Sequence, residues 1–334
     1  MKTAIFSAHA YDKNFLKAAN TNYGFQLQFY EQVLTEKTVS LAKNFDAICA
    51  FVHDELRTPV LEQLAQFGVK LITMRCAGFD NVDIAAAEKR GITVARVPAY
   101  SPYAVAEHAL GLILALNRKL HRAYHRVRES NFSLDGLLGF DLQGKTVGII
   151  GTGRIGAVLV KILLGLGCKV LAHDIQQNPI CIELGATYVD LETLYKESDI
   201  VSLHCPLTAD THHLIDDTSI QQMKPGVMII NTSRGAVVDT SAAIRGLKSG
   251  QVGSLGLDVY EGEQHLFFQD LSETIIQDDM FERLITFPNV LVTAHQGFFT
   301  RDALMSIAET TLRNIEGYPA DIPQQNLLTK EHCI

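Results

Sequence analysis

Three short segments carry side chains that could act together on a small acid. Arg234 follows one predicted strand, Glu261 and Glu263 follow the next, and His295 follows a third. Arginine binds a carboxylate through two parallel hydrogen bonds, and histidine gives or takes a proton near neutral pH. A carboxylate beside an imidazole orients the ring and stabilises its charged form. Beside a nicotinamide, these are the groups that reduction of a ketone requires.

Each of these side chains also has an ordinary structural interpretation. Arg234 could form a surface ion pair, the two glutamates could be solvated loop acids, and His295 could be a hydrogen-bonded core histidine. Their occurrence together, in a chain with a glycine-rich loop, favours the functional interpretation.

The glycine-rich loop Gly151-Thr-Gly153-Arg-Ile-Gly156 has a predicted strand before it and a predicted helix after it. Gly151 allows the tight turn, Gly153 lets a pyrophosphate approach the backbone, and Gly156 lets helix and strand pack closely. The helix N-terminus adds free N–H donors for phosphate. Asp174 ends the next predicted strand, where a carboxylate can bind the adenosine ribose hydroxyls, and no arginine adjoins it. The loop therefore predicts NAD rather than NADP, with a ligand-free glycine turn as the alternative.

The elements that position these residues alternate between short apolar runs and longer amphipathic ones. This alternation predicts an α/β fold of doubly wound parallel sheets covered by helices. Helices are expected at 59–67, 84–89, 102–119, 154–166 and 299–314. Strands are expected at 3–7, 47–52, 71–75, 93–96, 145–150, 169–172, 199–204, 227–231, 254–258 and 290–293.

Composition excludes several classes of protein. The chain has 334 residues, 47% of them hydrophobic and 20% charged, which suits two globular domains. Its net charge of −8 argues against nucleic-acid binding, and no apolar run reaches the roughly 18 residues of a membrane span. The six cysteines, Cys333 among them, form no CxxC pair and predict buried thiols in a reducing, cytoplasmic setting.

Histidine and cysteine are not arranged as metal ligands. His121 and His125 have helical spacing without a third ligand, and adjacent residues such as His204 and Cys205 face opposite sides of a strand. No metal site is therefore expected.

The motifs GTGRIG (151–156), HCPLT (204–208), NTSRGAVVD (231–239), GLDVYEGE (256–263) and VTAHQGF (292–298) resemble the D-isomer-specific 2-hydroxyacid dehydrogenase family. Three longer stretches, at 75–83, 97–112 and 266–284, are similar to its fermentative D-lactate dehydrogenases, and the last to their proteobacterial branch. The resemblance covers nearly the whole chain.

The resemblance implies reduction of pyruvate to D-lactate by NADH. It assigns Arg234 to the substrate carboxylate and carbonyl, His295 to acid/base catalysis and Glu263 to the histidine as its partner. The implied cofactor contacts are Gly151, Gly153, Arg154, Ile155, Gly156, Asp174, Cys205, Pro206, Thr211, Thr232, Ser233 and Asp258, with Thr211 standing where the family often has asparagine. The implied substrate contacts are the amides of Ala77 and Gly78, the rings of Tyr100 and Phe298, and Phe51, whose alternative is core packing.

The resemblance also implies an organisation. Residues 1–100 and 299–334 would form a flavodoxin-like substrate domain, and 101–298 a Rossmann nucleotide domain inserted into it, with the active site in the cleft between them. Family members are usually homodimers or homotetramers. The basic segment 118–128 is a candidate subunit contact, a solvated helix face being the alternative. The rival functions are reduction of bulkier 2-keto acids and NAD sensing by a non-enzymatic, corepressor-like protein.

Overall fold

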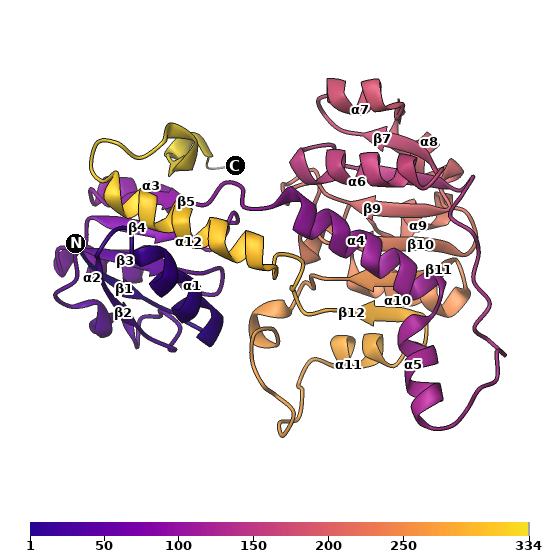
Figure 1. Cartoon of the computed structure of the whole chain (residues 1–334), viewed down its shortest axis with the longest axis horizontal. Coiled ribbons are helices and arrows are strands. Elements are labelled where there is room, and N and C mark those ends of the chain that lie inside the picture. The colour runs from indigo at the N-terminus through magenta and orange to yellow at the C-terminus, as the bar shows by residue number, and fades with distance from the viewer. Residues whose placement is uncertain (333–334) are drawn as a thin grey trace. The chain divides into compact units, whose positions relative to one another are not determined.

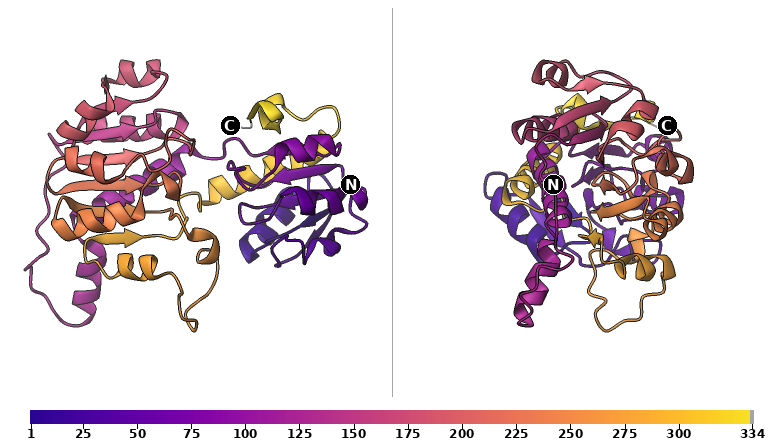
Figure 2. Two further views of the ribbon diagram at one scale, coloured as in Figure 1. Left: turned by 180° about the vertical axis from the view of Figure 1, so that it is seen from behind. Right: turned by 90° about the vertical axis from the view of Figure 1, so that its right-hand side faces the viewer.

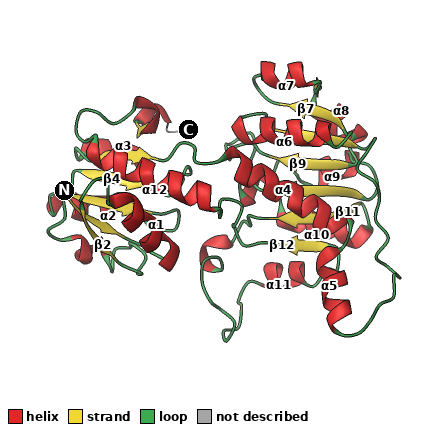
Figure 3. Ribbon diagram, in the orientation of Figure 1, coloured by secondary structure: helices red, strands yellow, loops and turns green. Residues whose placement is uncertain are grey.

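The computed structural model describes residues 1–332, so Cys333 lies outside the described part. The chain divides into two compact units, one made of Met1–Ser101 with the chain from Phe299 onward, the other of Pro102–Phe298. Each unit is a sheet with helices on both faces (Figures 1 and 3). The predicted doubly wound α/β fold is confirmed. Within residues 1–332, no helix is long and apolar enough to cross a membrane.

The first unit has a six-stranded sheet in the order β13-β5-β4-β3-β1-β2 among the described residues. All neighbouring pairs are parallel except β13 with β5. The order β2-β1-β3-β4-β5 is that of flavodoxin-like sheets. The strands are β1 (Lys2–Ile5), β2 (Gln26–Phe29), β3 (Ala47–Ala50), β4 (Leu71–Met74), β5 (Thr93–Arg96) and β13 (Leu327–Leu328).

Helices α1 (Ala10–Asn20) and α12 (Arg301–Glu316) pack together on one face of this sheet, although they lie far apart in the sequence (Figure 1). They bury Leu16 and Leu312 against the sheet. The other face carries α2 (Thr58–Gln66) and α3 (Ile84–Lys89). The returning helix α12 therefore completes the core of a unit that the N-terminal residues begin.

The second unit has a seven-stranded sheet in the order β12-β11-β10-β9-β6-β7-β8, and all its pairs are parallel. The order reverses between β6 and β9, the kind of switch point at which dinucleotides bind. The strands are β6 (Thr146–Ile150), β7 (Lys169–His173), β8 (Thr187–Tyr188), β9 (Ile200–Leu203), β10 (Val227–Asn231), β11 (Val252–Leu257) and β12 (Val290–Val292).

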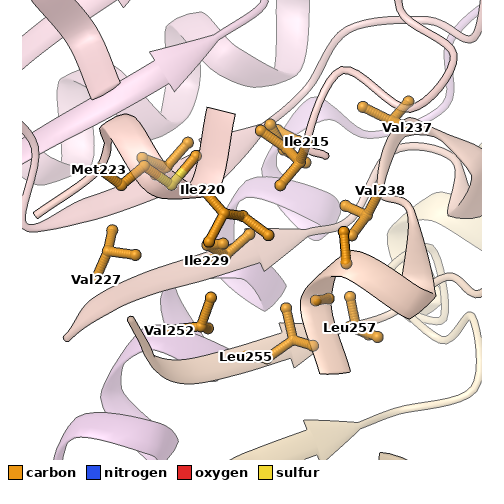
Figure 4. Close-up of a cluster of buried hydrophobic side chains, with 14 of the residues drawn as sticks. Ile215, Ile220, Met223, Val227, Ile229, Val237, Val238, Val252, Leu255 and Leu257 are labelled. Carbon is orange, nitrogen blue, oxygen red and sulfur yellow. The ribbon is translucent and has the colours of Figure 1, made fainter. Parts of the chain in front are cut away.

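Helices cover both faces of the second sheet (Figure 2). One face carries α4 (Pro102–Asn117), α6 (Arg154–Gly165) and α7 (Pro179–Leu184), and the other α8 (Leu191–Glu197), α9 (Asp217–Gln222) and α10 (Thr240–Ser249), with α11 (Asp279–Ile285) beside β12. Ile220, Ile229 and Leu255 share one buried apolar cluster, which fixes α9 against β10 and β11 (Figure 4). Helix α5 (Leu120–Arg128) has no buried residue.

Three strands were not predicted: β2, β8 and β13. All lie at a sheet edge, and β2 alternates exposed with half-buried residues. An edge strand is not buried on both faces, so it lacks the continuous apolar run by which the central strands were identified. The strand predicted at 47–52 ends at Ala50, which places Phe51 just after it.

Candidate active site

The three predicted catalytic residues follow adjacent strands of the second sheet. Asn231 of β10 pairs with Leu257 of β11, and Leu257 pairs with Val292 of β12. Because these strands are parallel and in register, the loops that carry Arg234, Glu263 and His295 leave the same edge of the sheet.

The loop of Arg234 is shaped by a fully buried asparagine. Asn231 Oδ1 accepts from Ser233 N at 3.0 Å and from Ser233 Oγ at 2.8 Å, and its Nδ2 donates to Arg234 O at 2.8 Å. Gly235 follows, and a Cβ there would lie 2.1 Å from the carbonyl carbon of Tyr260. Only glycine therefore lets the loop after β10 pack against the backbone of the loop after β11.

His295 and Glu263 meet directly. His295 Nδ1 lies 2.9 Å from Glu263 Oε1, while Glu263 Oε2 accepts from Tyr260 N at 3.0 Å. The ionised carboxylate only accepts, so Nδ1 carries the proton of the neutral ring. Nε2 has no hydrogen-bond partner within the described residues. It therefore gains a proton only in the charged ring, and that proton is available for transfer.

Asp258 holds the segment that carries His295. Its carboxylate accepts from Thr293 Oγ1 at 2.7 Å, Gln296 N at 2.8 Å and Gly297 N at 2.8 Å, and its carbonyl oxygen accepts from His295 N at 2.5 Å. Burial would raise the pKa of Asp258, but hydrogen bonds from His108 and Thr293 outweigh it, so the pKa lies below its ordinary value. Asp258 stays ionised near neutral pH.

Unusual backbone conformations gather at this point. Ala294 and His295 have φ of 50° and 58°, and Phe268 has φ of 63°. The Phe268 and Phe298 rings lie 5.8 and 6.4 Å from the His295 ring, centroid to centroid. Left-handed conformations of non-glycine residues cluster at functional sites, where surrounding contacts hold them.

The second glutamate of the motif has a different place. Glu261 lies 2.6 Å from His213 Nε2 and accepts from both the amide and the hydroxyl of Thr240, at 2.9 and 2.6 Å. Burial would raise the pKa of Glu261, but these hydrogen bonds lower it below its ordinary value. Glu261 therefore ties its loop to the start of α10, and Glu263 is the carboxylate beside His295.

The glycine loop has the geometry that a pyrophosphate needs. Gly151 has φ of 94°, and a Cβ on Gly156 would lie 2.0 Å from the carbonyl oxygen of Gly151. A Cβ on Gly153 would meet no protein atom within 4 Å, so the helix N-terminus opens onto free space. Arg154 is exposed and Ile155 half-buried there.

Asp174 lies directly after β7 and is partly exposed. Its Oδ2 accepts from Thr152 N at 2.6 Å and Thr152 Oγ1 at 3.1 Å, which ties the carboxylate to the glycine loop. The neighbouring Ile175 is fully exposed. The Asp174 carboxylate can thus hold the glycine loop through one oxygen and remain available to a ribose.

The remaining predicted cofactor residues surround the same sheet edge. Cys205 follows β9, and its amide would lie 2.6 Å from a Cβ on Gly151. Burial raises the pKa of its thiol to about 11, so the thiol is protonated near neutral pH. Thr211 Oγ1 donates to the carbonyl oxygen of Pro206 at 2.6 Å, and Pro206 is exposed. Thr232 Oγ1 is buried without a hydrogen-bond partner within the described residues. A buried hydroxyl without a partner, at the sheet edge from which the glycine loop also leaves, fits a polar ligand such as NAD.

In the first unit, the loop after β4 is held from its carbonyl side. Arg96 Nη1 donates to Ala77 O at 2.8 Å, and the Cys76 thiol lies 3.3 Å from Gly78 O. Within the described residues neither Ala77 nor Gly78 donates its amide to a backbone carbonyl. The loop therefore offers two N–H groups to an anion.

Phe51 and Tyr100 lie elsewhere in the first unit. Phe51 is 6% exposed, and its ring centroid lies 4.8 Å from the guanidinium carbon of Arg75. Arg75 is buried and donates to Asp12 at 3.0 Å and Ser7 O at 2.6 Å. Tyr100 is half-buried near the end of the segment that leads out of the first unit.

Sequence reasoning missed His108 and Thr293, and it left Asp258 without its structural role. His108 Nε2 lies 2.9 Å from Thr293 Oγ1 although the two residues are 185 positions apart. No local pattern reports such a contact. Within residues 1–332 no group of three or more His, Cys, Asp or Glu side chains is arranged to hold a metal ion.

Known proteins share both the sequence and the fold. A family model described as D-isomer specific 2-hydroxyacid dehydrogenase, NAD binding domain, matches residues 110–297. A D-lactate dehydrogenase of Escherichia coli is 54% identical over 315 residues, covering 94% of this chain and 96% of that protein. The apo-structure of D-lactate dehydrogenase from Escherichia coli has a TM-score of 0.90 at 50% identity, covering 98% of this chain and 100% of that one. A structure of the pyruvate reductase of Chlamydomonas reinhardtii has a TM-score of 0.91 at 47% identity, covering 97% of each chain.

Proposed function

Because this chain belongs to the D-isomer specific 2-hydroxyacid dehydrogenase family, we propose that it is an NAD-dependent D-lactate dehydrogenase. It reduces pyruvate with NADH and a proton to D-lactate and NAD⁺, and it runs in both directions. The observation that carries the proposal is the pairing of His295 Nδ1 with Glu263 at 2.9 Å in a unit built to bind NAD.

The acid/base step falls to His295. In reduction, the charged ring donates its Nε2 proton to the carbonyl oxygen of pyruvate, and in oxidation the neutral ring takes the proton back. Glu263 keeps Nδ1 protonated and stabilises the charge on the ring. Arg234 binds the pyruvate carboxylate through two hydrogen bonds and polarises the carbonyl.

The NAD cofactor, when bound, supplies or accepts the hydride. The residues that would hold it are the glycines of the loop, with Asp174 at the adenosine ribose and the helix N-terminus at the pyrophosphate. Further contacts come from Arg154, Ile155, Cys205, Pro206, Thr211, Thr232, Ser233 and Asp258. Substrate contacts in the first unit are the amides of Ala77 and Gly78 together with Tyr100 and Phe51, and in the second unit Phe298.

Two variants test these roles. His295→Ala should lower turnover in both directions by roughly 10²–10⁴-fold while NADH fluorescence still reports binding, because the glycine loop is intact. Arg234→Lys should mainly weaken pyruvate binding, since lysine cannot make the two-pronged contact. Near-normal turnover of His295→Ala in both directions would refute the assignment of the acid/base.

Substrate and enzymatic activity are tested together by a panel of 2-keto acids. Loss of NADH absorbance with pyruvate, followed by chiral analysis of the product, is expected to give D-lactate. A higher kcat/KM for a bulkier 2-keto acid would make the chain a reductase of that acid. NADH binding without oxidation of NADH by any 2-keto acid would indicate an NAD-sensing protein.

A homo-oligomer, dimer or tetramer, is part of the same proposal. Large apolar side chains lie exposed on α5 and on the segment after it: Leu120, Tyr124, Val127, Phe132, Leu134 and Leu138. A cluster of this kind on a soluble enzyme marks a protein contact. Light scattering should give a multiple of the chain mass, and Leu134→Asp with Leu138→Asp should lower it; a wild-type monomer would contradict the proposal.

A further inference from the structure

His108 lies in α4, outside every motif to which we assigned chemistry, and its ring reaches the site. Its Nε2 lies 2.9 Å from Thr293 Oγ1 and 3.2 Å from Asp258 Oδ1. The Thr293 hydroxyl donates its hydrogen bond to Asp258 Oδ1, at 2.7 Å. Its oxygen therefore accepts from His108, and Asp258 as a carboxylate can only accept. Nε2 of His108 carries a proton in the neutral ring as well as in the charged one.

Asp258, which accepts the hydrogen bond from His108, also binds the backbone around His295. Asp258 accepts the amides of Gln296 and Gly297 through its carboxylate and the amide of His295 through its carbonyl oxygen. The His108 ring also lies beside this turn, since a Cβ on Gly297 would be 3.6 Å from its Cδ2. A change in the position of the carboxylate is therefore passed to the turn on which the His295 ring stands.

The turn needs such support because its backbone is strained. Ala294 and His295 have φ of 50° and 58°, a conformation that L-residues keep only when contacts over-determine it. Three donors of the turn bind Asp258, and His108 donates to the same carboxylate from α4. In the described residues, His108 is the only donor to the Asp258 carboxylate that lies outside the segment 293–297. His108 thus anchors the turn to α4.

We propose that His108 is a positioning residue of the dehydrogenase, which holds His295 in its reactive place by donating Nε2–H to Asp258 and Thr293. This inference rests on the proposed function. It assigns His108 no contact with substrate or cofactor. The role of His108 depends on its hydrogen bond and not on the size of its ring. A neutral side chain whose N–H group reaches the same acceptors should therefore replace His108.

The charges around the turn fix the direction of a pH effect. His108 in α4 and His295 in the loop after β12 both face Asp258. His295 also faces Glu263. Loss of the His108 donor leaves the negative charge of Asp258 less compensated, which stabilises the charged His295 ring. The fall of reduction rate with rising pH should then move to higher pH. If His108 only filled space, its replacement would not change the pH at which the reduction rate falls.

Three variants test the proposal in the full-length enzyme. His108→Phe keeps the ring without a donor, His108→Gln keeps a neutral N–H at the same reach, and Thr293→Val removes the shared hydroxyl at constant shape. We expect kcat for pyruvate reduction to fall about 10-fold in His108→Phe, the size of a small displacement of a catalytic group. His108→Gln should keep near-wild-type kcat and the wild-type pH limb.

Thr293→Val provides a second route should His108→Phe fold poorly. The two residues share one hydrogen-bond network, so the loss in the double variant His108→Phe with Thr293→Val should stay near the larger single loss rather than reach the product. Equal losses in His108→Phe and His108→Gln, or losses that multiply in the double variant, would overturn the proposal. A wild-type enzyme that does not oxidise NADH with any 2-keto acid would instead refute the proposed function.

Discussion

Replacing Gly153 with alanine should separate cofactor binding from folding. A Cβ at Gly153 meets no protein atom within 4 Å, and the residue has φ of −63°, which alanine adopts without strain. The folded chain therefore tolerates the methyl group. The free space that it fills is the space in which the pyrophosphate should meet the first turn of α6.

The size of the effect follows from the hydrogen bonds at stake. The first helical hydrogen bond of α6 is donated by Ala157 to the carbonyl of Gly153, so the preceding amides remain available to a phosphate. A hydrogen bond to a charged group contributes about 1.5–3 kcal/mol. Displacing the pyrophosphate from one or two such donors should weaken NADH binding by about 10- to 10⁴-fold. The free energy of unfolding without NADH should change by less than about 1 kcal/mol.

The assay combines NADH titration by fluorescence with thermal unfolding of the free protein. Gly165→Ala is the matched control, because Gly165 ends the same helix with no atom within 4 Å of its Cβ. It should keep both affinity and stability. Gly156→Ala is the opposite case, since its Cβ would lie 2.0 Å from Gly151 O and should destabilise the fold itself. Wild-type NADH affinity in Gly153→Ala would refute the placement of the pyrophosphate.

Four further predictions follow from single side chains. Asp174→Ala should reduce the preference for NADH over NADPH in kcat/KM, since the carboxylate no longer repels a 2′-phosphate; a wild-type preference for NADPH would contradict this. Glu263→Gln should move the fall of pyruvate reduction to lower pH, because a neutral amide no longer stabilises the charged His295 ring, and unchanged pH profiles would argue against the pairing. Phe51→Leu should favour bulkier 2-keto acids over pyruvate by at most about 1–3 kcal/mol per accommodated group, whereas equal ratios would assign Phe51 to the core. Burial lowers the pKa of His204 from 6.5 to about 4, so stability present above pH 6.5 is lost as the pH falls toward 4. His204→Gln should reduce that loss, by about 2 kcal/mol, in urea unfolding at the two pH values.

The central strands could be predicted from the sequence because they are buried on both faces. All five residues of β10 are buried, which produces the apolar run that identifies a parallel strand. The two-residue strands β8 and β13 are too short to show any period, and β2 alternates at an exposed edge. Their pairing depends on the neighbouring strand rather than on their own composition.

The same distinction holds at the site. Arg234, Glu263 and His295 could be located because chemistry restricts the residue type and a strand end restricts the place. The roles of Asp258 and His108 could not be located in this way, because their significance is a contact across 150 positions of the chain, His108 Nε2 to Asp258 Oδ1 at 3.2 Å. A half-buried histidine in an apolar helix gives the same local pattern whether it fills space or donates to a carboxylate.

The structure therefore divides the work of the site between two kinds of residue. Left-handed backbone at Ala294 and His295 costs about 1–3 kcal/mol for each residue, and it persists only because other contacts offset it. Asp258 supplies those contacts as an ionised acceptor, the kind that forms the stronger hydrogen bonds. An apolar residue at 258 would leave the amides of Gln296 and Gly297 without their side-chain acceptor. We expect His295 then to move away from Glu263 although both side chains remain. The groups that we propose to react are thus recognisable from their type, whereas the geometry proposed for them depends on a buried carboxylate and on its contact with α4.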